Sequence, residues 1–401
     1  MSIFVILPDH CTGWTKIVNM HKVIVLGGGM VGRAMAIDLA KMHRVTLCDV
    51  NPETLEHAQK KCRELTVQPL DVTREKDLRR IINNYDLVIN AVPGFLGFRT
   101  LKTVIKEGHN VVDIAFSPEN TLELDALARE RGVTAIVDCG VAPGMDNLIL
   151  GRYNEIMKLN EFECLVGGLP RTRKWPFSYK APFSPVDVIE EYTRPARYVE
   201  HGEVVIREPL SDCEYVYFEK VGTLESFNTD GLRSIIHTMS HIPNMKEKTL
   251  RYPGHVEYVK VLKESGFFST AEMDVNGVRI SPIDFTRSVL FREWKLEENE
   301  EELTVMRVTL KGENSQGQTE EVTYELYDEY CSETETSSMA RTTGYAATAA
   351  ASLFLEGLFT EKGIFPPELV GKHENCFEYF LDYLGKRNIQ YKKSQSLIQE
   401  D

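Results

Sequence analysis

Short apolar runs alternate with amphipathic stretches between residue 21 and about residue 138. Each run is rich in aliphatic and β-branched residues and shows little polar alternation, which is typical of strands buried on both faces of a sheet. The runs lie at 23–26, 45–49, 65–69, 87–91, 111–114 and 135–138. Stretches with helical spacing separate them, and repeated strand–helix units of this kind predict a doubly wound parallel sheet.

The pattern changes after about residue 144. Several segments now alternate polar and apolar residues, as strands with one solvent-facing side do. They lie at 162–169, 203–207, 214–221, 303–311 and 320–330, and helical spacing returns at 339–357 and 374–386. We interpret the alternating segments as a mainly antiparallel sheet in a second domain of α+β type. The predicted division is an N-terminal extension (1–19), a first domain (20–145), a second domain (146–335), and C-terminal helices (336–401) that pack back on the first domain.

Residues 1–19 stand apart from the strand–helix alternation. A short apolar run is followed at once by Pro8, Asp9 and His10, and the positively charged leader of a signal peptide is missing. We interpret the segment as an N-terminal extension outside the fold, with an additional edge strand as the alternative.

Charge and cysteine content narrow the class of protein. Lys and Arg number 46 against 60 for Asp and Glu, a net charge of −14, which argues against binding to nucleic acid or to an anionic membrane. The eight cysteines form no CxxC pair and show no spacing typical of a metal site or a disulfide framework. No apolar run reaches the roughly 18–20 residues of a membrane span. We therefore expect a cytoplasmic protein with reduced thiols, without a metal site, and without nucleic-acid or membrane partners.

A glycine-rich turn follows the first predicted strand. Gly27, Gly29 and Gly32 have the G-x-G-x-x-G spacing, with Met30 and Val31 between the last two. In this setting the first glycine makes the tight turn, the second lets backbone amides approach a pyrophosphate, and the third lets the helix lie close to the strand. The helix N-terminus adds unpaired amides and partial positive charge. Because strand, turn, helix and second strand occur in this order, the segment predicts a Rossmann-type dinucleotide-binding domain.

An acidic residue ends the second predicted strand. Asp49 lies 22 residues after Gly27, where a carboxylate accepts hydrogen bonds from both ribose hydroxyls and repels a 2′-phosphate. No arginine follows it directly, so we predict NAD rather than NADP as the cofactor. Asp71 follows the third strand and is a candidate for the adenine side, although a helix cap explains it equally well.

Later strand ends complete the predicted cofactor site, because ligands bind outside the carboxyl ends of parallel strands. Val92, Pro93 and Gly94 follow the fourth strand and are expected beside the nicotinamide half of the cofactor. Asp113 follows the fifth strand and Asp138 the sixth. Each of these two is either a site residue or a residue that caps a helix or forms a turn.

The second domain carries arginines in loops that also contain Gly or Pro. These loops lie at 167–180, 190–198, 225–234 and 249–257. A guanidinium group can make two parallel hydrogen bonds to a carboxylate, so this domain is predicted to bind a substrate that carries a carboxylate. Each arginine taken alone is also explained by a surface or interdomain ion pair.

Segments from about residue 22 to residue 391 match one known superfamily. They read GGGMVGRA, NAVPGFLGF, VVDIAFSPEN, CGVAPGMDN, VGGLP, EEYTRPAR, FNTDGLRS, TLRYPGH, SSMARTTGY and GIFPPE. With these segments the chain resembles the saccharopine dehydrogenase superfamily, most of all its NAD-dependent L-lysine 6-dehydrogenases. Saccharopine dehydrogenases more often have DPG and a following Asp-His where this chain has APGMD at 142–146, and this departure favours lysine over saccharopine.

The resemblance implies that NAD oxidises the side-chain amine of L-lysine to an imine, whose hydrolysis releases ammonia and leaves 2-aminoadipate 6-semialdehyde. The amine must first be neutral, although free lysine has a pKa of about 10.4, and the distant α-carboxylate and α-amino groups must orient the substrate. Candidates for these roles are Arg233 and Arg251 for the carboxylate, Asp230 for an amino group, and His255 or Asp113 for proton transfer.

Two other functions remain open at this point. One is a related C–N oxidoreductase with a larger substrate, such as a saccharopine dehydrogenase or reductase or a carboxynorspermidine-type reductase. The other is a dinucleotide-binding protein without turnover, which leaves the Arg, Asp and His residues of the second domain unexplained. Sheets like the one predicted for the second domain often join two subunits, so we expect a homodimer that acts on a small amino acid.

Overall fold

The computed structural model describes residues 4–8, 15–183, 185–297 and 300–398. The chain divides into two compact units. Unit 1 comprises Met1–Gly140 and Thr343–Pro366, and unit 2 comprises Val141–Thr342 and Pro367–Asp401. The stretch 336–401, expected as helices on the first domain, is therefore divided between the two units.

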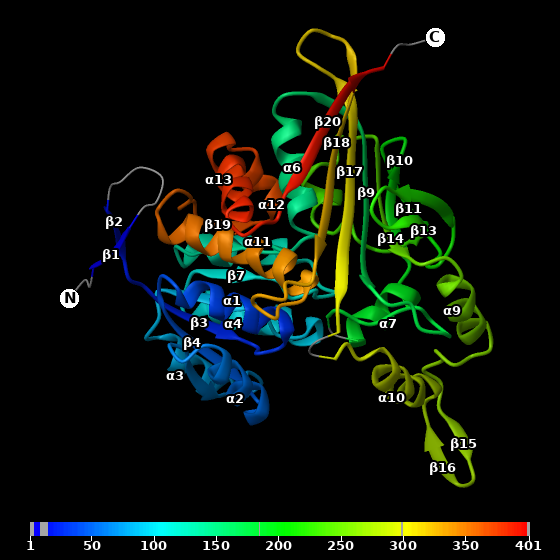
Figure 1. Cartoon of the computed structure of the whole chain (residues 1–401), viewed down its shortest axis with the longest axis horizontal. Helices are drawn as coiled ribbons and strands as arrows, with labels where there is room; N and C mark the ends of the chain where they lie inside the picture. The colour runs from blue at the N-terminus through cyan, green and yellow to red at the C-terminus, as the bar shows by residue number, and fades with distance from the viewer. Residues whose placement is uncertain (1–3, 9–14, 184, 298–299, 399–401) are drawn as a thin grey trace. The chain divides into compact units, whose positions relative to one another are not determined.

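Unit 1 is built on a seven-stranded sheet whose strands are all parallel (Figure 1). The strand order is β19-β8-β7-β6-β3-β4-β5. The strands are β3 (Lys22–Leu26), β4 (Arg44–Asp49), β5 (Thr66–Pro69), β6 (Leu87–Asn90), β7 (Val111–Asp113), β8 (Thr134–Ile136) and β19 (Gly363–Phe365). The order runs outward in both directions from β3 and β6, so the predicted doubly wound parallel sheet is confirmed. In such sheets ligands bind at the carboxyl ends of the strands where the order reverses.

Helices connect the strands of unit 1. They are α1 (Met30–Ala40), α2 (Pro52–Lys61), α3 (Glu75–Ile82), α4 (Gly94–Lys106) and α5 (Asp125–Glu130), with a 3₁₀ turn, η1 (Thr121–Leu124), before α5. The apolar residues 23–26 of β3 are fully buried, as the uninterrupted run predicts. Gly97 lets α4 lie against the segment after β7, because a Cβ at this position would collide with Ala115 and Ser117.

The described part of the N-terminal segment forms a small sheet of its own. β1 (Phe4–Pro8) pairs antiparallel with β2 (Thr15–Asn19), and neither pairs with the seven-stranded sheet. The predicted extension over 1–19 also includes residues 1–3 and 9–14, which lie outside the described part of the chain.

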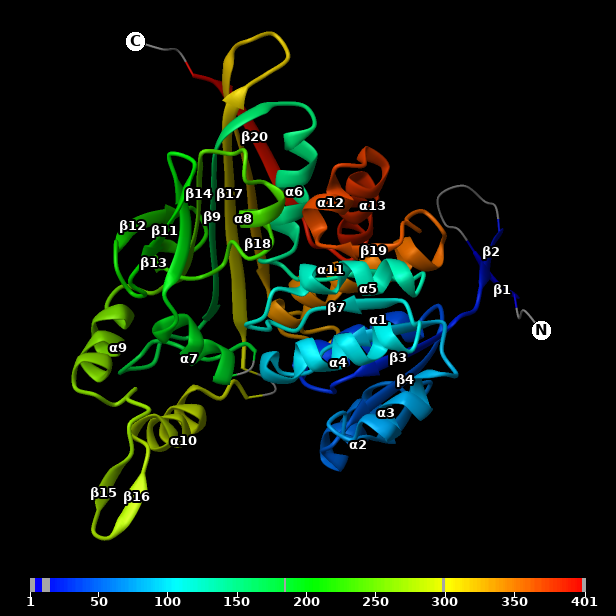
Figure 2. The same cartoon turned by 180° about the vertical axis from the view of Figure 1, so that it is seen from behind.

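Unit 2 contains a nine-stranded sheet (Figure 2). The order is β11-β10-β14-β9-β17-β18-β20, and the hairpin β12–β13 joins it through β14. The strands are β9 (Lys158–Pro170), β10 (Ala196–Glu200), β11 (Glu203–Arg207), β12 (Glu214–Phe218), β13 (Gly222–Asn228), β14 (Asn244–Arg251), β17 (Glu302–Glu313), β18 (Thr319–Glu329) and β20 (Tyr391–Leu397). β9 and β14 are parallel to each other, and the other pairs are antiparallel. The predicted α+β domain with a mainly antiparallel sheet is therefore confirmed.

Helices and one further hairpin complete unit 2. The helices are α6 (Met145–Asn154), α7 (Pro185–Thr193), α8 (Ile235–Thr238), α9 (His255–Glu264), α10 (Pro282–Trp294), α12 (Pro367–Gly371) and α13 (Glu374–Gly385). The hairpin consists of β15 (Met273–Val275) and β16 (Val278–Ile280), and α11 (Ser338–Leu355) runs from unit 2 into unit 1. Within the described ranges, no helix combines the length and the apolar character needed to cross a membrane.

Candidate functional site

The glycine turn at the start of α1 has the geometry that a dinucleotide requires. Gly27 has a φ of +102°, and a Cβ there would collide with the carbonyl oxygen of Ala91, just after β6. A Cβ on Gly32 would collide with the carbonyl oxygen of Gly27, whereas a Cβ on Gly29 would meet nothing within 4 Å. The first and third glycines therefore permit close packing of turn, helix and sheet, and space is open at the second.

The first amides of α1 face no competing side-chain acceptor within the helix. Gly29 is the N-cap and makes no side-chain cap, and the first turn carries no acidic residue. Met30 and Val31 are half-buried in this turn. A helix N-terminus of this kind offers unpaired N–H groups and partial positive charge to a phosphate. The residues present thus fit the pyrophosphate of a dinucleotide.

Asp49 ends β4 beside the same turn. Its Oδ2 accepts a hydrogen bond from the Gly28 amide at 2.6 Å, and its Oδ1 accepts one from the Asn51 amide at 2.8 Å. These amides hold the half-buried carboxylate in one orientation. Each carboxylate oxygen keeps a further lone pair, so the group can also accept hydrogen bonds from the two hydroxyls of a ribose.

The other predicted cofactor residues follow the carboxyl ends of neighbouring strands. Asp71 follows β5, and its Oδ1 accepts hydrogen bonds from Thr73 Oγ1 at 2.6 Å and Thr73 N at 2.9 Å. These two bonds hold the pKa of the Asp71 carboxyl below its usual value. They form a local turn before α3, whose N-cap is Arg74, so Asp71 is not the helix cap that the sequence offers as the alternative to an adenine contact. After β6, Val92 is buried, Pro93 is the exposed N-cap of α4, and Gly94 begins that helix.

Asp113 is held at the carboxyl end of β7, next to the end of β6. It is 1% exposed, and its Oδ1 accepts hydrogen bonds from Asn90 Nδ2 at 3.0 Å and from the Ala115 amide at 2.9 Å. Asp138, just after β8, has a φ of 52°. Left-handed backbone is uncommon for residues other than glycine, with Asp among the more tolerant, so Asp138 shapes the turn that follows the strand.

In unit 2, Arg251 ends β14 within a cage of aromatic rings. Its guanidinium carbon lies 4.4 Å from the centroid of the Tyr179 ring. One terminal nitrogen donates to Glu191 Oε2 at 2.7 Å, the other donates to the Leu250 carbonyl at 3.0 Å, and Nε donates to the Tyr192 hydroxyl at 3.3 Å. Most of the N–H donors of Arg251 are therefore engaged inside unit 2.

His255, the first residue of α9, belongs to the same network. Its Nε2 lies 2.9 Å from the Tyr192 hydroxyl, and its Nδ1 lies 3.0 Å from the Phe177 carbonyl oxygen. Because a carbonyl can only accept, Nδ1 carries the proton and Nε2 accepts from Tyr192. Burial, followed by the positive charge of Arg251, lowers the pKa of His255 to about 3. The imidazole is therefore neutral near pH 7, and Tyr192 links it to Arg251.

Asp230 and Arg233 lie in the loop after β13. Arg197 makes a two-pronged ion pair with Asp230, with Nε to Oδ1 and NH2 to Oδ2 both at 2.9 Å. Arg233 is buried and has a φ of 48°. Burial raises the pKa of Glu247 well above its usual value, the charge of Asp230 raises it further, and the charge of Arg233 lowers it. Both loop residues therefore lie in the electrostatic surroundings of Glu247.

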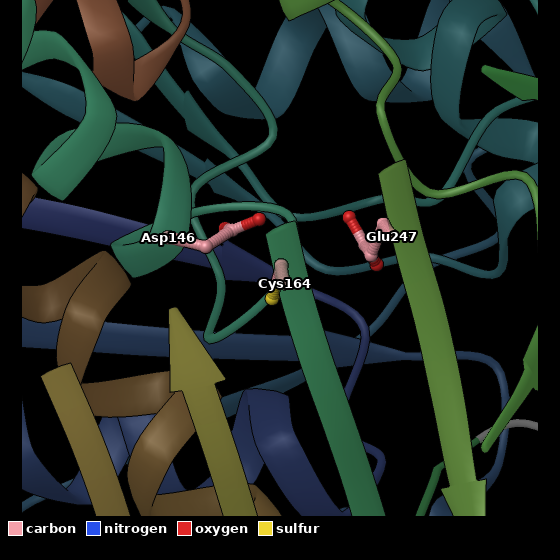
Figure 3. Close-up of side chains that lie close together, drawn as sticks. All are labelled: Asp146, Cys164 and Glu247. Atoms are coloured by element: carbon pink, nitrogen blue, oxygen red, sulfur yellow. The ribbon is translucent and has the colours of Figure 1, made fainter. Parts of the chain in front are cut away.

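Three buried polar residues of unit 2 were not among the predicted site residues. Asp146 is at the start of α6, Cys164 is on β9 and Glu247 is on β14, and Figure 3 shows their side chains close together. One oxygen of each carboxyl group and the Cys164 Sγ lie within 4.8 Å of one another. Burial raises the pKa of Asp146 to about 7. This is a closely spaced pair of buried acids with a thiol beside them.

The sequence held a signal for only one of these acids. Asp146 follows a Pro-Gly turn at the point where a helix begins, within one of the segments that carry the family resemblance. Glu247 lies in a stretch reading NMKEKTLR, whose charges indicate an exposed surface. Five of the eight residues of β14 are nevertheless buried in succession at its end, Glu247 included. Hydrophobic patterning therefore had no means of locating this strand.

Two family models together match almost the whole chain. The saccharopine dehydrogenase C-terminal domain matches residues 140–389, and the saccharopine dehydrogenase NADP binding domain matches residues 23–136. The first of these alone covers more than half of the 401 residues.

The chain is also similar to curated proteins, at modest sequence identity. The NADP(+), L-glutamate-forming saccharopine dehydrogenase of Pyricularia oryzae is 28% identical over 265 residues, which is 62% of this chain and 58% of the relative. The carboxyaminopropylagmatine dehydrogenase of Synechocystis sp. is 22% identical over 404 residues, which is 93% of this chain and 97% of the relative. The first curated relatives are matched over less of their own length, of which the chain spans 27%, 58% and 62%.

A solved structure has the same fold. The apo saccharopine dehydrogenase (L-Glu forming) from Saccharomyces cerevisiae has a TM-score of 0.75 and 22% sequence identity, and the match covers 94% of this chain and 100% of that chain.

Proposed function

The chain belongs to the saccharopine dehydrogenase family, and from this premise we propose that it is an NAD-dependent oxidoreductase that deaminates the side chain of L-lysine. The relatives named above are dehydrogenases, and the family includes a dinucleotide-binding domain. The proposal adds two specific points, which are the choice of NAD and the choice of lysine.

The carboxylate of Asp49 at the glycine turn carries the choice of NAD. It is fixed by the amides of Gly28 and Asn51, so it cannot easily turn away from a ribose bound beside the turn. A 2′-phosphate at that place would bring two negative groups together. The family model is named for NADP and the Pyricularia relative for NADP(+), so a direct comparison of the two cofactors tests this point.

The choice of lysine rests on two observations. The segments TRPAR, NTDGLRS and RYPGH contribute to the resemblance to the lysine 6-dehydrogenases, and the departure at 142–146 favours lysine over saccharopine. In addition, the buried ion pair Arg251–Glu191 and the part-buried pair Arg197–Asp230 are internal to unit 2, while Asp146 and Glu247 form a pair of acids. Such a balance of buried charge favours a cationic amine over a substrate with several carboxylates.

The reaction makes clear demands on the chain. The bound cofactor supplies the acceptor for the hydride that leaves the amine-bearing carbon. The polar groups of unit 2 must then orient the α-carboxylate and α-amino group, exclude bulk water, and accept the proton that the ammonium group loses. Arg233 for the carboxylate and Asp113 or His255 for proton transfer remain proposals for these roles, and Asp230 remains one for an amino group.

Saccharopine is the second candidate substrate, because the Pyricularia relative is named as a saccharopine dehydrogenase and the yeast structure shares the fold. The test is reduction of NAD and of NADP by the purified chain with L-lysine, saccharopine and carboxyaminopropylagmatine, followed by absorbance of the reduced cofactor. We expect turnover with L-lysine and NAD, together with release of ammonia. Turnover with saccharopine and release of glutamate would refute the proposed substrate, and faster reduction of NADP would refute the proposed cofactor.

A further inference from the structure

The buried acids Asp146 and Glu247 form one polar cluster with Cys164 in unit 2. Cys164 on β9 and Glu247 on β14 are register partners in the parallel pair of strands, so their side chains project from the same face of the sheet. Asp146 approaches that face from the start of α6. Figure 3 shows the two carboxyl groups pointing toward one another, with the Cys164 sulfur below the line between them. The three residues are 0%, 0% and 4% exposed for Asp146, Cys164 and Glu247.

Each of the two carboxyl groups has an oxygen that no N–H or O–H group of the described residues reaches. These atoms are Asp146 Oδ2 and Glu247 Oε2, and both are buried. The weakly donating Cys164 thiol also interacts with Asp146 through a side-chain hydrogen bond. Asp146 Oδ1 accepts a hydrogen bond from the Gly144 amide at 2.8 Å, which restrains the orientation of the carboxyl group and leaves Oδ2 as its oxygen without a backbone donor. The hydroxyl of Tyr391, buried in the electrostatic reach of Asp146 and Cys164, likewise has no hydrogen-bond partner among the described residues. Buried polar atoms of this kind are normally satisfied by a ligand, a water molecule or an ion.

The charged groups around Asp146 and Glu247 do not neutralise the charge of the two carboxylates. The acids that act on it have other partners: Glu191 pairs with Arg251, and Asp230 pairs with Arg197. Glu368 accepts hydrogen bonds from Asn147 Nδ2 at 3.0 Å and Thr238 Oγ1 at 2.6 Å. Arg233 is the cation whose charge acts on Glu247. If both groups were ionised, two carboxylates opposed by one guanidinium would leave a single negative charge in a buried place.

A protonated amine satisfies this arrangement better than a proton or a metal ion does. An ammonium group carries one positive charge and three N–H donors, enough for Asp146 Oδ2 and Glu247 Oε2 together. A shared proton neutralises the charge but leaves the Tyr391 hydroxyl and much of the acceptor capacity unused. A transition metal would need the Cys164 thiolate, and burial together with the charges of Asp146 and Glu247 raises the pKa of that thiol well above its usual value.

We propose that Asp146 and Glu247 form the subsite that binds the side-chain ammonium group of the amine substrate. This inference rests on the proposed function for the existence of such a substrate. Without the ammonium group the two carboxyl groups hold at least one proton at neutral pH, because two buried like charges this close cannot both ionise. The incoming ammonium group takes the place of that proton.

The test compares two ligands by titration calorimetry with the whole chain. Cadaverine has the ammonium group but no α-carboxylate, and L-norleucine has the α-groups but no side-chain amine. For the parent we expect cadaverine to release about one proton at pH 8, above the pKa of about 7 of Asp146, seen as a dependence of the binding heat on the ionisation enthalpy of the buffer. In Asp146→Asn and Glu247→Gln we expect cadaverine to bind roughly 10- to 150-fold more weakly with a changed proton release, while L-norleucine binds as in the parent.

Glu302→Gln is the matched control. Glu302 is a buried acid of unit 2 whose pKa burial raises to about 8, and its Oε1 accepts a hydrogen bond from the Met339 amide at 2.7 Å, which glutamine can also accept. We expect cadaverine binding and proton release to be unchanged in this variant. The amide substitutions keep the size of each side chain, and the Asp146→Asn variant keeps an acceptor for the Gly144 amide. If one of the two subsite variants fails to fold, the other carries the same comparison.

The outcomes separate this inference from the proposed function. A parent that oxidises L-lysine while Asp146→Asn and Glu247→Gln leave cadaverine binding and proton release unchanged would overturn the subsite and leave the activity standing. Loss of L-norleucine binding with intact cadaverine binding would also overturn it, because the pair would then hold the α-amino group. Zinc retained at one per chain after dialysis and lost in Cys164→Ala would identify a metal centre instead. Cadaverine binding with proton release in a parent that oxidises no amine would support the subsite and refute the activity.

Discussion

Replacement of Arg251 by methionine is expected to destabilise unit 2 strongly. The pair with Glu191 is short, at 2.7 Å, and the two side chains are 3% and 19% exposed. Methionine keeps the apolar length of the side chain but removes every donor, which leaves the Glu191 carboxyl buried without its cation. Breaking a buried pair in this way costs about 3–5 kcal/mol of the free energy of unfolding.

A second substitution, at Glu191, tests the expected loss of unfolding free energy. Burial raises the pKa of Glu191, and the charge of Arg251 lowers it, so without the arginine the carboxyl takes up a proton more readily or is expelled toward solvent. The double variant Arg251→Met with Glu191→Gln removes both charges, and we expect it to recover much of the loss. As a control, Arg207→Met breaks the exposed pair with Glu200, whose side chains are 43% and 37% exposed, and should change stability by about 1 kcal/mol or less.

Urea unfolding followed by tryptophan fluorescence reports on this region. Trp294 is fully buried, and its ring lies 5.4 Å from Tyr179, the ring on which Arg251 stacks. The reasoning is refuted if Arg251→Met unfolds at the parent's urea concentration. If that stable variant also loses kcat/KM for L-lysine but not for cadaverine, Arg251 binds the substrate carboxylate, as the sequence predicts.

Three further predictions concern the cofactor, the N-terminus and pH. The parent should bind NAD more tightly than NADP by about 2–3 kcal/mol, or roughly 30–150-fold, and Asp49→Ala should narrow that ratio mainly by weakening NAD; equal affinities in the parent would contradict the role of the carboxylate. Deletion of residues 1–19 should leave the melting temperature and turnover unchanged, because β1 and β2 pair only with each other among the described strands; loss of soluble protein would disprove this. His255 has a folded-state pKa of about 3 against an ordinary value of 6.5, so the unfolded chain binds the extra proton and the parent should lose up to about 1.4 kcal/mol per pH unit as the pH falls below 6.5. His255→Gln should lack this part of the pH dependence in urea titrations, and identical slopes in the two proteins would exclude it.

The period of the hydrophobic pattern predicted most of the fold because it depends on local burial. Strands buried on both faces, such as β3, and strands with one exposed face, such as β18, differ in period and were distinguishable. β14 was not, because its buried face carries Glu247 and Arg251 where apolar residues are expected. β19 is only three residues long, and its place beside β8 depends on a contact between residues more than 200 positions apart.

The residues of the candidate site also differ in whether a local sequence pattern can predict them. The glycine turn and Asp49 are recognised within 23 consecutive residues, because each glycine answers a local requirement of the backbone. The partners of the second unit are remote in sequence: Glu191 lies 60 residues before Arg251, and Tyr192 lies 63 before His255. The sequence indicated Arg251 and His255 as candidate site residues, but no pattern could predict which side chains form hydrogen bonds with them.

The late arrival of β19 has a consequence for synthesis on the ribosome. β8 ends at Ile136, and the strand that covers its outer edge ends only at Phe365. At roughly 5–20 residues per second, about 10–45 s separate the emergence of these two strands. During that interval the nascent first unit exposes an open, apolar strand edge, which is a template for pairing with other chains. A messenger truncated after residue 140 would make that exposure permanent, so the isolated first unit should depend on chaperones far more than the full chain does.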